Sequence, residues 1–331
     1  MRRYSLPVFV LFLLIVGTVH AEKDERPASD STSEGPVFDC PKSEEEPTAS
    51  YVGPNKGYDS AVSAMDVARD YYCASTYKNT HYPSGFVTVF GSSRLDEYIQ
   101  HESLRRGADA SEEEHLKKEF NATYVTLKTF AHMWTMDYGK RYPILTGAGP
   151  GLMEAASRGA MEAGGPSVGY TTYYAPGTTL PHSAKGPLFA RYNKEFPITS
   201  TGLVFSTVSA RETAMITHSA AMVFAPGGTG THWEIFQTLE MVKSKELPPI
   251  PIYFLGSKEN WESLEELRAT MIQAKTIKAE ELVFRYAECA QDLENKLAHD
   301  LGLSTAIVPS SEYACKSRST YEEQARKELQ M

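Results

Sequence analysis

Apolar strand-like runs and helix-like segments alternate along most of this chain, and that alternation limits what it can fold into. The predicted strands cover residues 86–90, 144–146, 168–174, 203–206, 222–225, 250–255 and 282–286. The predicted helices cover residues 60–73, 111–140, 152–163, 210–220, 232–245, 261–274 and 289–299. Parallel strands need helical crossovers, and sheets of this kind are covered on both faces. The pattern therefore predicts an α/β fold with a doubly wound, mostly parallel sheet and helices on both of its faces.

The first predicted helix carries its apolar residues at helical spacing. Val62, Met65, Ala68 and Tyr72 fall on one side of it, and we expect that side to face the core.

The first residues read as a secretory signal peptide. Arg2 and Arg3 precede an apolar stretch over 6–19, and Ala21 ends a cleavage site. An uncleaved anchor is the alternative, but a spanning helix needs about 20 apolar residues and this run is shorter. We therefore expect cleavage after Ala21, export to the periplasm or outside the cell, and no stable membrane anchor.

Composition divides the remainder of the chain. Residues 22–50 are rich in Glu, Ser, Pro and Asp and are typical of an acidic disordered linker. The folded domain is expected over 51–303, and 304–331 is expected to be a polar C-terminal tail. The formal net charge of -9 gives no basic surface for nucleic acid, although a small anionic ligand needs only a local positive site.

The cysteines leave several arrangements open. Cys40, Cys73, Cys289 and Cys315 match neither a zinc pattern nor a CxxC pattern. In an oxidising compartment they are expected to form one or two disulfides, with three possible pairings, while unpaired buried thiols are the alternative.

Three turns rich in small residues follow predicted strands, where parallel sheets bind ligands. Residues 91–94 read GSSR, residues 146–154 read TGAGPGLME, and residues 226–234 read PGGTGTHWE. Glycines let a ligand approach the backbone, and the N–H groups at the start of the following helix favour an anion. No Lys follows the last glycine of the third turn, so it is not an ATP-binding Walker loop. The alternatives are a plain strand-to-helix turn for the first and a tight turn without a ligand for the second.

For two charged residues near these turns, a structural role is the alternative to a functional one. Thr231 and Glu234 have the spacing of a capping box, as do Ser209 and Glu212, so Glu234 is either a helix cap or a functional acid. Arg211 falls in the first turn of its predicted helix, where a cation opposes the helix dipole. That unfavourable position indicates a functional arginine, with a solvent-facing arginine as the alternative.

The second and third turns together resemble the two signatures of the LOG (Lonely Guy) family, often labelled "lysine decarboxylase". The resemblance rests on TGAGPGLMEAASRGA over 146–160 and PGGTGTHWE over 226–234, and it extends over about 86–255. The family includes cytokinin riboside 5'-monophosphate phosphoribohydrolases and nucleotide 5'-monophosphate nucleosidases. The resemblance implies a modified Rossmann fold, a homodimer with shared sites, and Arg211 and Glu234 as the catalytic pair.

The resemblance and the three turns together give the candidate substrate-binding residues. The PGGTGT loop is expected to hold the 5'-phosphate, and the turn after the first strand to line the nucleotide pocket. The candidates are Ser92, Ser93, Gly149, Gly151, Leu152, Met153, Glu154, Gly227, Gly228, Thr229, Gly230 and Thr231. The chain departs from the family in having Glu212 after the catalytic Arg, where Lys is usual, Trp233 before the catalytic Glu, where an acid is usual, and GAG where GGG is usual in the second turn.

The predicted reaction is hydrolysis of the N-glycosidic bond of a nucleoside 5'-monophosphate, giving free base and ribose 5-phosphate. Such a bond breaks through an oxocarbenium-like state, which a carboxylate can stabilise while it activates water. The reaction needs no metal or redox cofactor, and no PLP-lysine context supports decarboxylation. The alternative is a non-catalytic nucleotide-binding or molybdenum-cofactor-binding protein of the same fold. A redox enzyme is disfavoured because the first strand-to-helix turn lacks GxGxxG.

Overall fold

A computed structural model describes residues 38, 40, 63–93, 110–172 and 198–303, and for 110–121 it describes the backbone only. The predicted signal peptide, nearly all of the acidic linker and the C-terminal tail lie outside these residues. So do residues 51–62 at the predicted start of the folded domain.

Within the described ranges, seven strands form one sheet in which every pairing is parallel. Their order is β4-β3-β2-β1-β5-β6-β7. The strands are β1 (Phe86–Phe90), β2 (Ile144–Thr146), β3 (Ser167–Thr172), β4 (Thr201–Phe205), β5 (Ser219–Phe224), β6 (Ile252–Leu255) and β7 (Arg285–Ala287). This is the doubly wound α/β fold that the alternation predicted.

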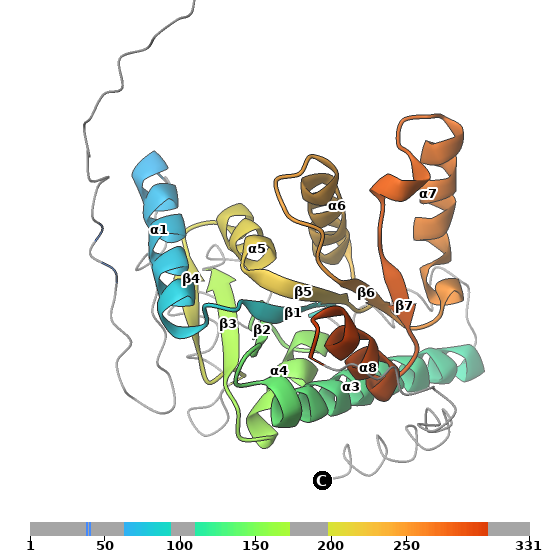
Figure 1. Cartoon of the computed structure of the whole chain (residues 1–331). Helices are drawn as coiled ribbons and strands as arrows, with labels where there is room; N and C mark the ends of the chain where they lie inside the picture. The colour runs from blue at the N-terminus through green and yellow to red at the C-terminus, as the bar shows by residue number, and fades with distance from the viewer. Residues whose placement is uncertain (1–37, 39, 41–62, 94–109, 173–197, 304–331) are drawn as a thin grey trace, which may run out of the picture. The chain divides into compact units, whose positions relative to one another are not determined.

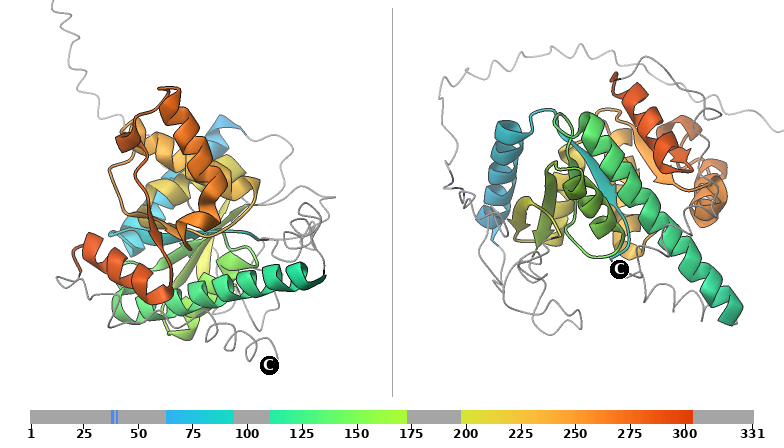
Figure 2. Two further views of the ribbon diagram at one scale, coloured as in Figure 1. Left: turned by 90° about the vertical axis from the view of Figure 1, so that its right-hand side faces the viewer. Right: turned by 90° about the horizontal axis from the view of Figure 1, so that it is seen from below.

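The first helix runs to His81 instead of ending near Cys73 as predicted, the other helices begin and end within three residues of their predicted bounds, and the helices cover both faces of the sheet (Figure 1, Figure 2). They are α1 (Ala64–His81), α3 (Ala110–Tyr138), α4 (Leu152–Glu162), α5 (Val208–Thr217), α6 (Thr229–Lys243), α7 (Glu262–Gln273) and α8 (Ala290–Asp300). Two short 3₁₀ helices, Lys258–Trp261 and Ala279–Glu281, precede α7 and β7. Among the helices of the described residues, we find none with the length and apolar character that a membrane crossing requires.

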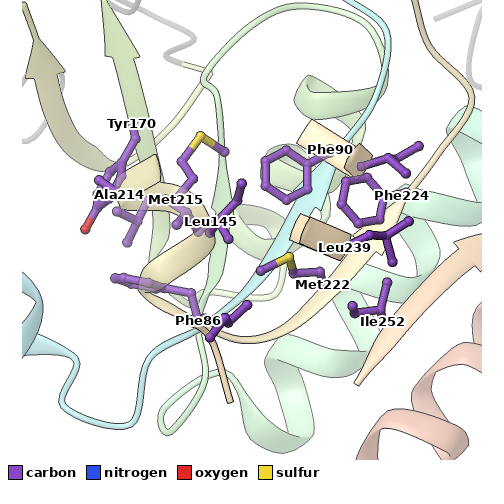
Figure 3. Close-up of a cluster of buried hydrophobic side chains, with 14 of the residues drawn as sticks. Phe86, Phe90, Leu145, Tyr170, Ala214, Met215, Met222, Phe224, Leu239 and Ile252 are labelled. Carbon is purple, nitrogen blue, oxygen red and sulfur yellow. The ribbon is translucent and has the colours of Figure 1, made fainter. Parts of the chain in front are cut away.

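The two faces have separate apolar cores. One core packs α1, α5, α6 and α7 against the sheet, and Figure 3 shows its centre, where Phe90 and Phe224 stack at 4.9 Å between ring centroids. The other core packs α3, α4 and α8 against the opposite face. Because both faces are covered, every residue of β1 is buried, which explains why its sequence is apolar apart from Thr88, whose hydroxyl bonds to that of Ser219.

The predicted apolar side of the first helix is wrong. In α1, Met65 is 56% exposed and Tyr72 is 40% exposed, Ala68 is exposed as well, and Val62 lies outside the described residues. The buried residues are Asp70, Cys73, Ala74 and Tyr77.

The buried side of α1 includes an aspartate, and the spacing of apolar residues does not reveal it. Asp70 accepts hydrogen bonds from the backbone N–H and the hydroxyl of Ser206, directly after β4. Burial raises the pKa of Asp70 to about 6. The helix is therefore oriented by a polar contact to the β4–α5 turn.

The same helix carries a disulfide. Cys73 is bonded to Cys40, which selects one of the three pairings left open by the sequence. Cys289 is disulfide-bonded as well, so unpaired thiols are not found at these positions.

The strand order creates one point where the chain reverses its direction across the sheet. From β1 the chain runs outward to β4, and it then returns to place β5 on the other side of β1. In open parallel sheets, ligands bind at the carboxyl ends of the strands beside such a point. The turns after β1 and β5 therefore occupy the expected ligand position.

Candidate functional site

The three small-residue turns come together at the carboxyl edge of the sheet. The N–H of Ser92, after β1, donates to the carbonyl of Pro226, after β5, over 3.1 Å. The carbonyl of Ser92 accepts from the N–H of Leu152, at the start of α4, over 3.0 Å. Ser92 thus joins the turn after β5 to the helix that follows β2.

One glycine is needed for this close assembly. A Cβ at Gly227 would collide with the side chain of Thr231 and would lie 3.1 Å from the backbone nitrogen of Ser92. A Cβ at Gly149 would lie 2.5 Å from Cε of Met153, the flexible end of that side chain, and in ordinary contact with Cβ of Ser93. Gly227 therefore lets the turns after β1 and β5 approach each other.

The start of α6 has the features of an anion site. Gly228 is its N-cap and provides no side-chain cap, and Gly228, Thr229 and Gly230 are exposed. First-turn N–H groups have no partner within a helix, and together with the helix dipole they attract anions. The predicted phosphate loop is thus accessible and lies at the reversal point of the sheet.

The start of α4 also lacks a side-chain cap, but the acidic candidate there already has a partner. Gly151 is its N-cap with φ +72°, again without a side-chain cap, and Ala148 before it has φ +54°. A non-glycine residue with positive φ is uncommon and marks a constrained turn. The carboxylate of Glu154 is bound by Arg158 at 2.6 Å, so this candidate has a partner within its own helix.

Glu234 is not a helix cap. Helix α6 begins at Thr229, and the N–H of His232 bonds to the carbonyl of Gly228, so Glu234 lies in the second turn. The capping-box alternative for Thr231 and Glu234 is therefore wrong. The sequence pattern misplaced it because the helix starts three residues earlier than predicted.

The second suggested capping box is wrong for the same reason. Helix α5 begins at Val208, and the hydroxyl of Thr207 accepts from the N–H of Ala210 over 3.0 Å. Neither Ser209 nor Glu212 caps this helix. Arg211 follows the first three helical residues and points inward, with 7% exposure, so a solvent-facing arginine is excluded too.

Arg211 meets two buried carboxylates. Its Nη2 lies 2.7 Å from Oε1 of Glu212 and 3.5 Å from Oε1 of Glu234. Glu212 is 1% exposed and Glu234 is 7% exposed. Two acids from neighbouring helices thus share one guanidinium in a position that water hardly reaches.

The pKa values of Glu212 and Glu234 are set by their burial and by the charges of their neighbours. Burial raises the pKa of Glu234 to about 8, with Arg211 opposing the shift and the charge of Glu212 adding to it. Burial also raises the pKa of Glu212, and Arg211 again opposes the shift. Strongly shifted acids at the ligand-binding edge of a sheet are typical of functional sites.

The structure brings most of the predicted residues to one edge but gives them different surroundings. Ser92 and Thr231 are buried, Ser93 and Met153 are half-buried, and Leu152 is fully buried in the core beneath α4. Leu152 therefore positions the turn and does not present its side chain to a ligand.

Gly147 is a position that the sequence analysis did not single out. A Cβ there would lie 3.0 Å from the sulfur of Met153 and in ordinary contact, at 3.5 Å, with Nη1 of Arg211, so Gly147 lies directly beside the guanidinium. Its place as the first glycine after a strand was the available signal. Across the residues that the structure describes, no three His, Cys, Asp or Glu side chains are grouped as a metal site would require.

The part of the chain that carries the site is similar to a known family. Residues 153–298 match the family model described as "Possible lysine decarboxylase". That segment contains both Arg211 and Glu234, and the match confirms the resemblance drawn from the two motifs. Among curated proteins, no sequence matches this chain.

Solved structures with a similar fold include two proteins named for the molybdenum cofactor. The molybdenum cofactor carrier protein MCP from Chlamydomonas reinhardtii is 18% identical over 66% of this chain and 98% of its own, with a TM-score of 0.40. The molybdenum cofactor binding protein from Rippkaea orientalis is 18% identical over 54% and 87%, with a TM-score of 0.36. The protein TM1055 is 16% identical over 65% and 99%, with a TM-score of 0.41.

Proposed function

We propose that this chain, whose residues 153–298 belong to the family described as possible lysine decarboxylases, hydrolyses the N-glycosidic bond of nucleoside 5'-monophosphates. Its motifs are those of the LOG type. One observation carries the proposal: Arg211 and Glu234, from the neighbouring helices α5 and α6, are buried with 3.5 Å between Nη2 and Oε1, close to an exposed glycine loop. A buried acid, a cation and an uncapped helix start are the groups that this reaction needs.

The phosphate is bound by backbone groups. The N–H groups at the start of α6, with the hydroxyl of Thr229, hold the 5'-phosphate. Arg211 anchors the phosphate or the ribose through its forked donors, which fixes the sugar relative to Glu234. Binding of the phosphate thereby positions the glycosidic bond, which is not part of the phosphate, for hydrolysis.

The hydrolytic step uses Glu234 as an anion. The bond between C1' of the ribose and the base nitrogen breaks, and positive charge develops on the ribose. Glu234 stabilises that charge and takes a proton from the attacking water, whose oxygen bonds to C1'. The proton is passed to the departing base, so that the products are the free base and ribose 5-phosphate.

The raised pKa of Glu234 has a consequence for this role. With a pKa of about 8, a large part of Glu234 is protonated near neutral pH in the free protein. A carboxylate that must accept a proton works only when ionised. The rate constant kcat/KM, which reports the free enzyme, should therefore rise with pH toward about 8.

The test is incubation of the purified protein, lacking residues 1–21, with a panel of nucleoside 5'-monophosphates and the matching nucleosides. Released base and ribose 5-phosphate are measured together. We expect release from at least one monophosphate and much slower release from its nucleoside. Tight binding of nucleotides without any released base would instead support the non-catalytic nucleotide-binding or molybdenum-cofactor-binding alternative.

A further inference from the structure

Trp233 differs from the other two tryptophans of the chain. It is 46% exposed, whereas Trp134 is fully buried and Trp261 is 5% exposed. A large aromatic side chain left open to solvent costs favourable burial. Its position directly before Glu234 suggests that something covers it when the site is in use.

The neighbours of Trp233 along α6 show which way this side of the helix faces. Gln237, one turn later, donates from Nε2 to the hydroxyl of Thr213 on α5 over 2.8 Å. Residues four apart lie on the same side of a helix. Trp233 is therefore on the side of α6 that faces α5, one turn closer to the carboxyl edge of the sheet.

The first turn of α6 leaves room for a ligand beside this tryptophan. Helical side chains lean toward the N-terminus of their helix and cover the preceding turn. The preceding turn here contains Thr229 and Gly230, both exposed, and a Cβ at Gly230 would meet no atom within 4 Å. By its place in α6, Trp233 therefore lies between the predicted phosphate loop, which precedes it, and Glu234, which directly follows it.

From this arrangement we propose that Trp233 is the platform on which the nucleobase of the substrate stacks. The inference rests on the proposed function, since it places the phosphate at the start of α6. From Gly228 to Trp233 the helix rises about 7.5 Å, and the side chain leans back toward the helix start, so the indole is within reach of a base that one ribose separates from a phosphate at the start of α6. Stacking gains with ring area, so the site favours purine 5'-monophosphates over pyrimidine ones.

The first experiment uses the fluorescence of Trp233. Acrylamide should quench this exposed tryptophan and spare the two buried ones. The Glu234→Gln variant is used so that the nucleotide stays intact. AMP should protect Trp233 from quenching, UMP should protect it less, and ribose 5-phosphate should not protect it although it binds.

The second experiment removes the ring. Trp233→Ala should weaken AMP binding about 5- to 150-fold, the range for loss of one base-stacking contact. Its affinity for ribose 5-phosphate should stay unchanged, and Trp233→Phe should restore most of the AMP affinity. Phe keeps a stacking surface, so it serves as the matched control.

Several results would overturn the inference. Equal loss of AMP and ribose 5-phosphate affinity in Trp233→Ala would mean a structural role, and unchanged AMP affinity would mean that the base does not touch the indole. Quenching that falls as protein concentration rises, without nucleotide, would assign Trp233 to a subunit contact. Normal stacking with no base release by the wild-type protein would leave the platform in place and refute only the proposed hydrolysis.

Discussion

Arg211 donates a 2.7 Å hydrogen bond to Glu212, the residue that follows it in α5. Glu234 is further from the same nitrogen, at 3.5 Å. Glu212 therefore competes with the proposed catalytic acid for the one guanidinium, and its charge adds to the raised pKa of Glu234. The departure from the family at this position has a direct effect on the proposed site.

Glu212→Gln should move the pH dependence of the reaction. Removing the charge of Glu212 and freeing Arg211 both lower the pKa of Glu234, so its ionised form should appear at lower pH. We expect the acid side of the kcat/KM profile to shift downward by about one pH unit, which corresponds to roughly 1.4 kcal/mol. The check is a pH-rate profile of the variant beside the wild type.

Glu240→Gln is the control for that shift, because Glu240 lies in α6 and its side chain is 62% exposed. It should leave the profile where it is. A Glu212→Gln profile that coincides with the wild type would show that Glu212 does not act on Glu234.

Arg211→Ala should weaken nucleotide binding and turnover and should also destabilise the fold. Arg211 lowers the pKa of both acids, so without it two buried carboxylates have no cation. Removing one partner of a buried ion pair costs about 3 kcal/mol or more. The loss should grow as pH rises and the acids ionise, as urea unfolding at pH 6 and pH 9 would show.

An exposed arginine provides the comparison. Arg285→Ala breaks an ion pair with Asp300 in which the arginine side chain is 51% exposed. Exposed pairs contribute about 1 kcal/mol or less, so this variant should keep its binding and turnover. Equal behaviour of the two variants would contradict the role given to Arg211.

We expect the protein to be a homodimer in solution, because the LOG resemblance implies sites shared between two subunits. Light scattering of the mature protein at micromolar concentration should give twice the chain mass. A monomer mass that accompanies full activity would rule out a shared site.

We expect export with a mature N-terminus at Glu22, from the basic, apolar and small-residue series at the start of the chain. The disulfide between Cys40 and Cys73 is of the kind that persists in oxidising compartments. N-terminal sequencing of protein from its native host checks the cleavage. Recovery of protein that begins at Met1 would refute it.

Much of the fold follows from the sequence because most of the buried strands are short and largely apolar, and glycines directly follow β1, β2 and β6. The helix phase of α1 does not, since Asp70 replaces an apolar residue on the buried side and is stabilised by Ser206, which lies far along the chain. The last strand was misplaced too: Leu282–Phe284 precede β7, and only Arg285–Ala287 pair with β6.

The site could be predicted in its parts and not in its contacts. The glycine turns and the LOG motifs identified Arg211 and Glu234. The sharing of Arg211 by two acids depends on how α5 and α6 pack, and no spacing in the sequence shows this. The start of α6 was misjudged because Gly228 is its N-cap where a hydroxyl residue was expected, and the start of α5 because Thr207 caps it in place of Ser209.

The most direct measurement of the central claim is base release by wild-type and Glu234→Gln protein from the same 5'-monophosphate at pH 8. A preorganised charged group contributes about 3 kcal/mol to a transition state, which corresponds to a loss of roughly a hundredfold or more. The fold should survive, because Glu234 does not cap α6. Its raised pKa means that its ionisation costs stability progressively as pH rises through about 8, so the variant should unfold no earlier than the wild type at pH 9. Our account predicts a large loss of rate with nucleotide binding retained, and turnover within a few-fold of wild type would contradict it.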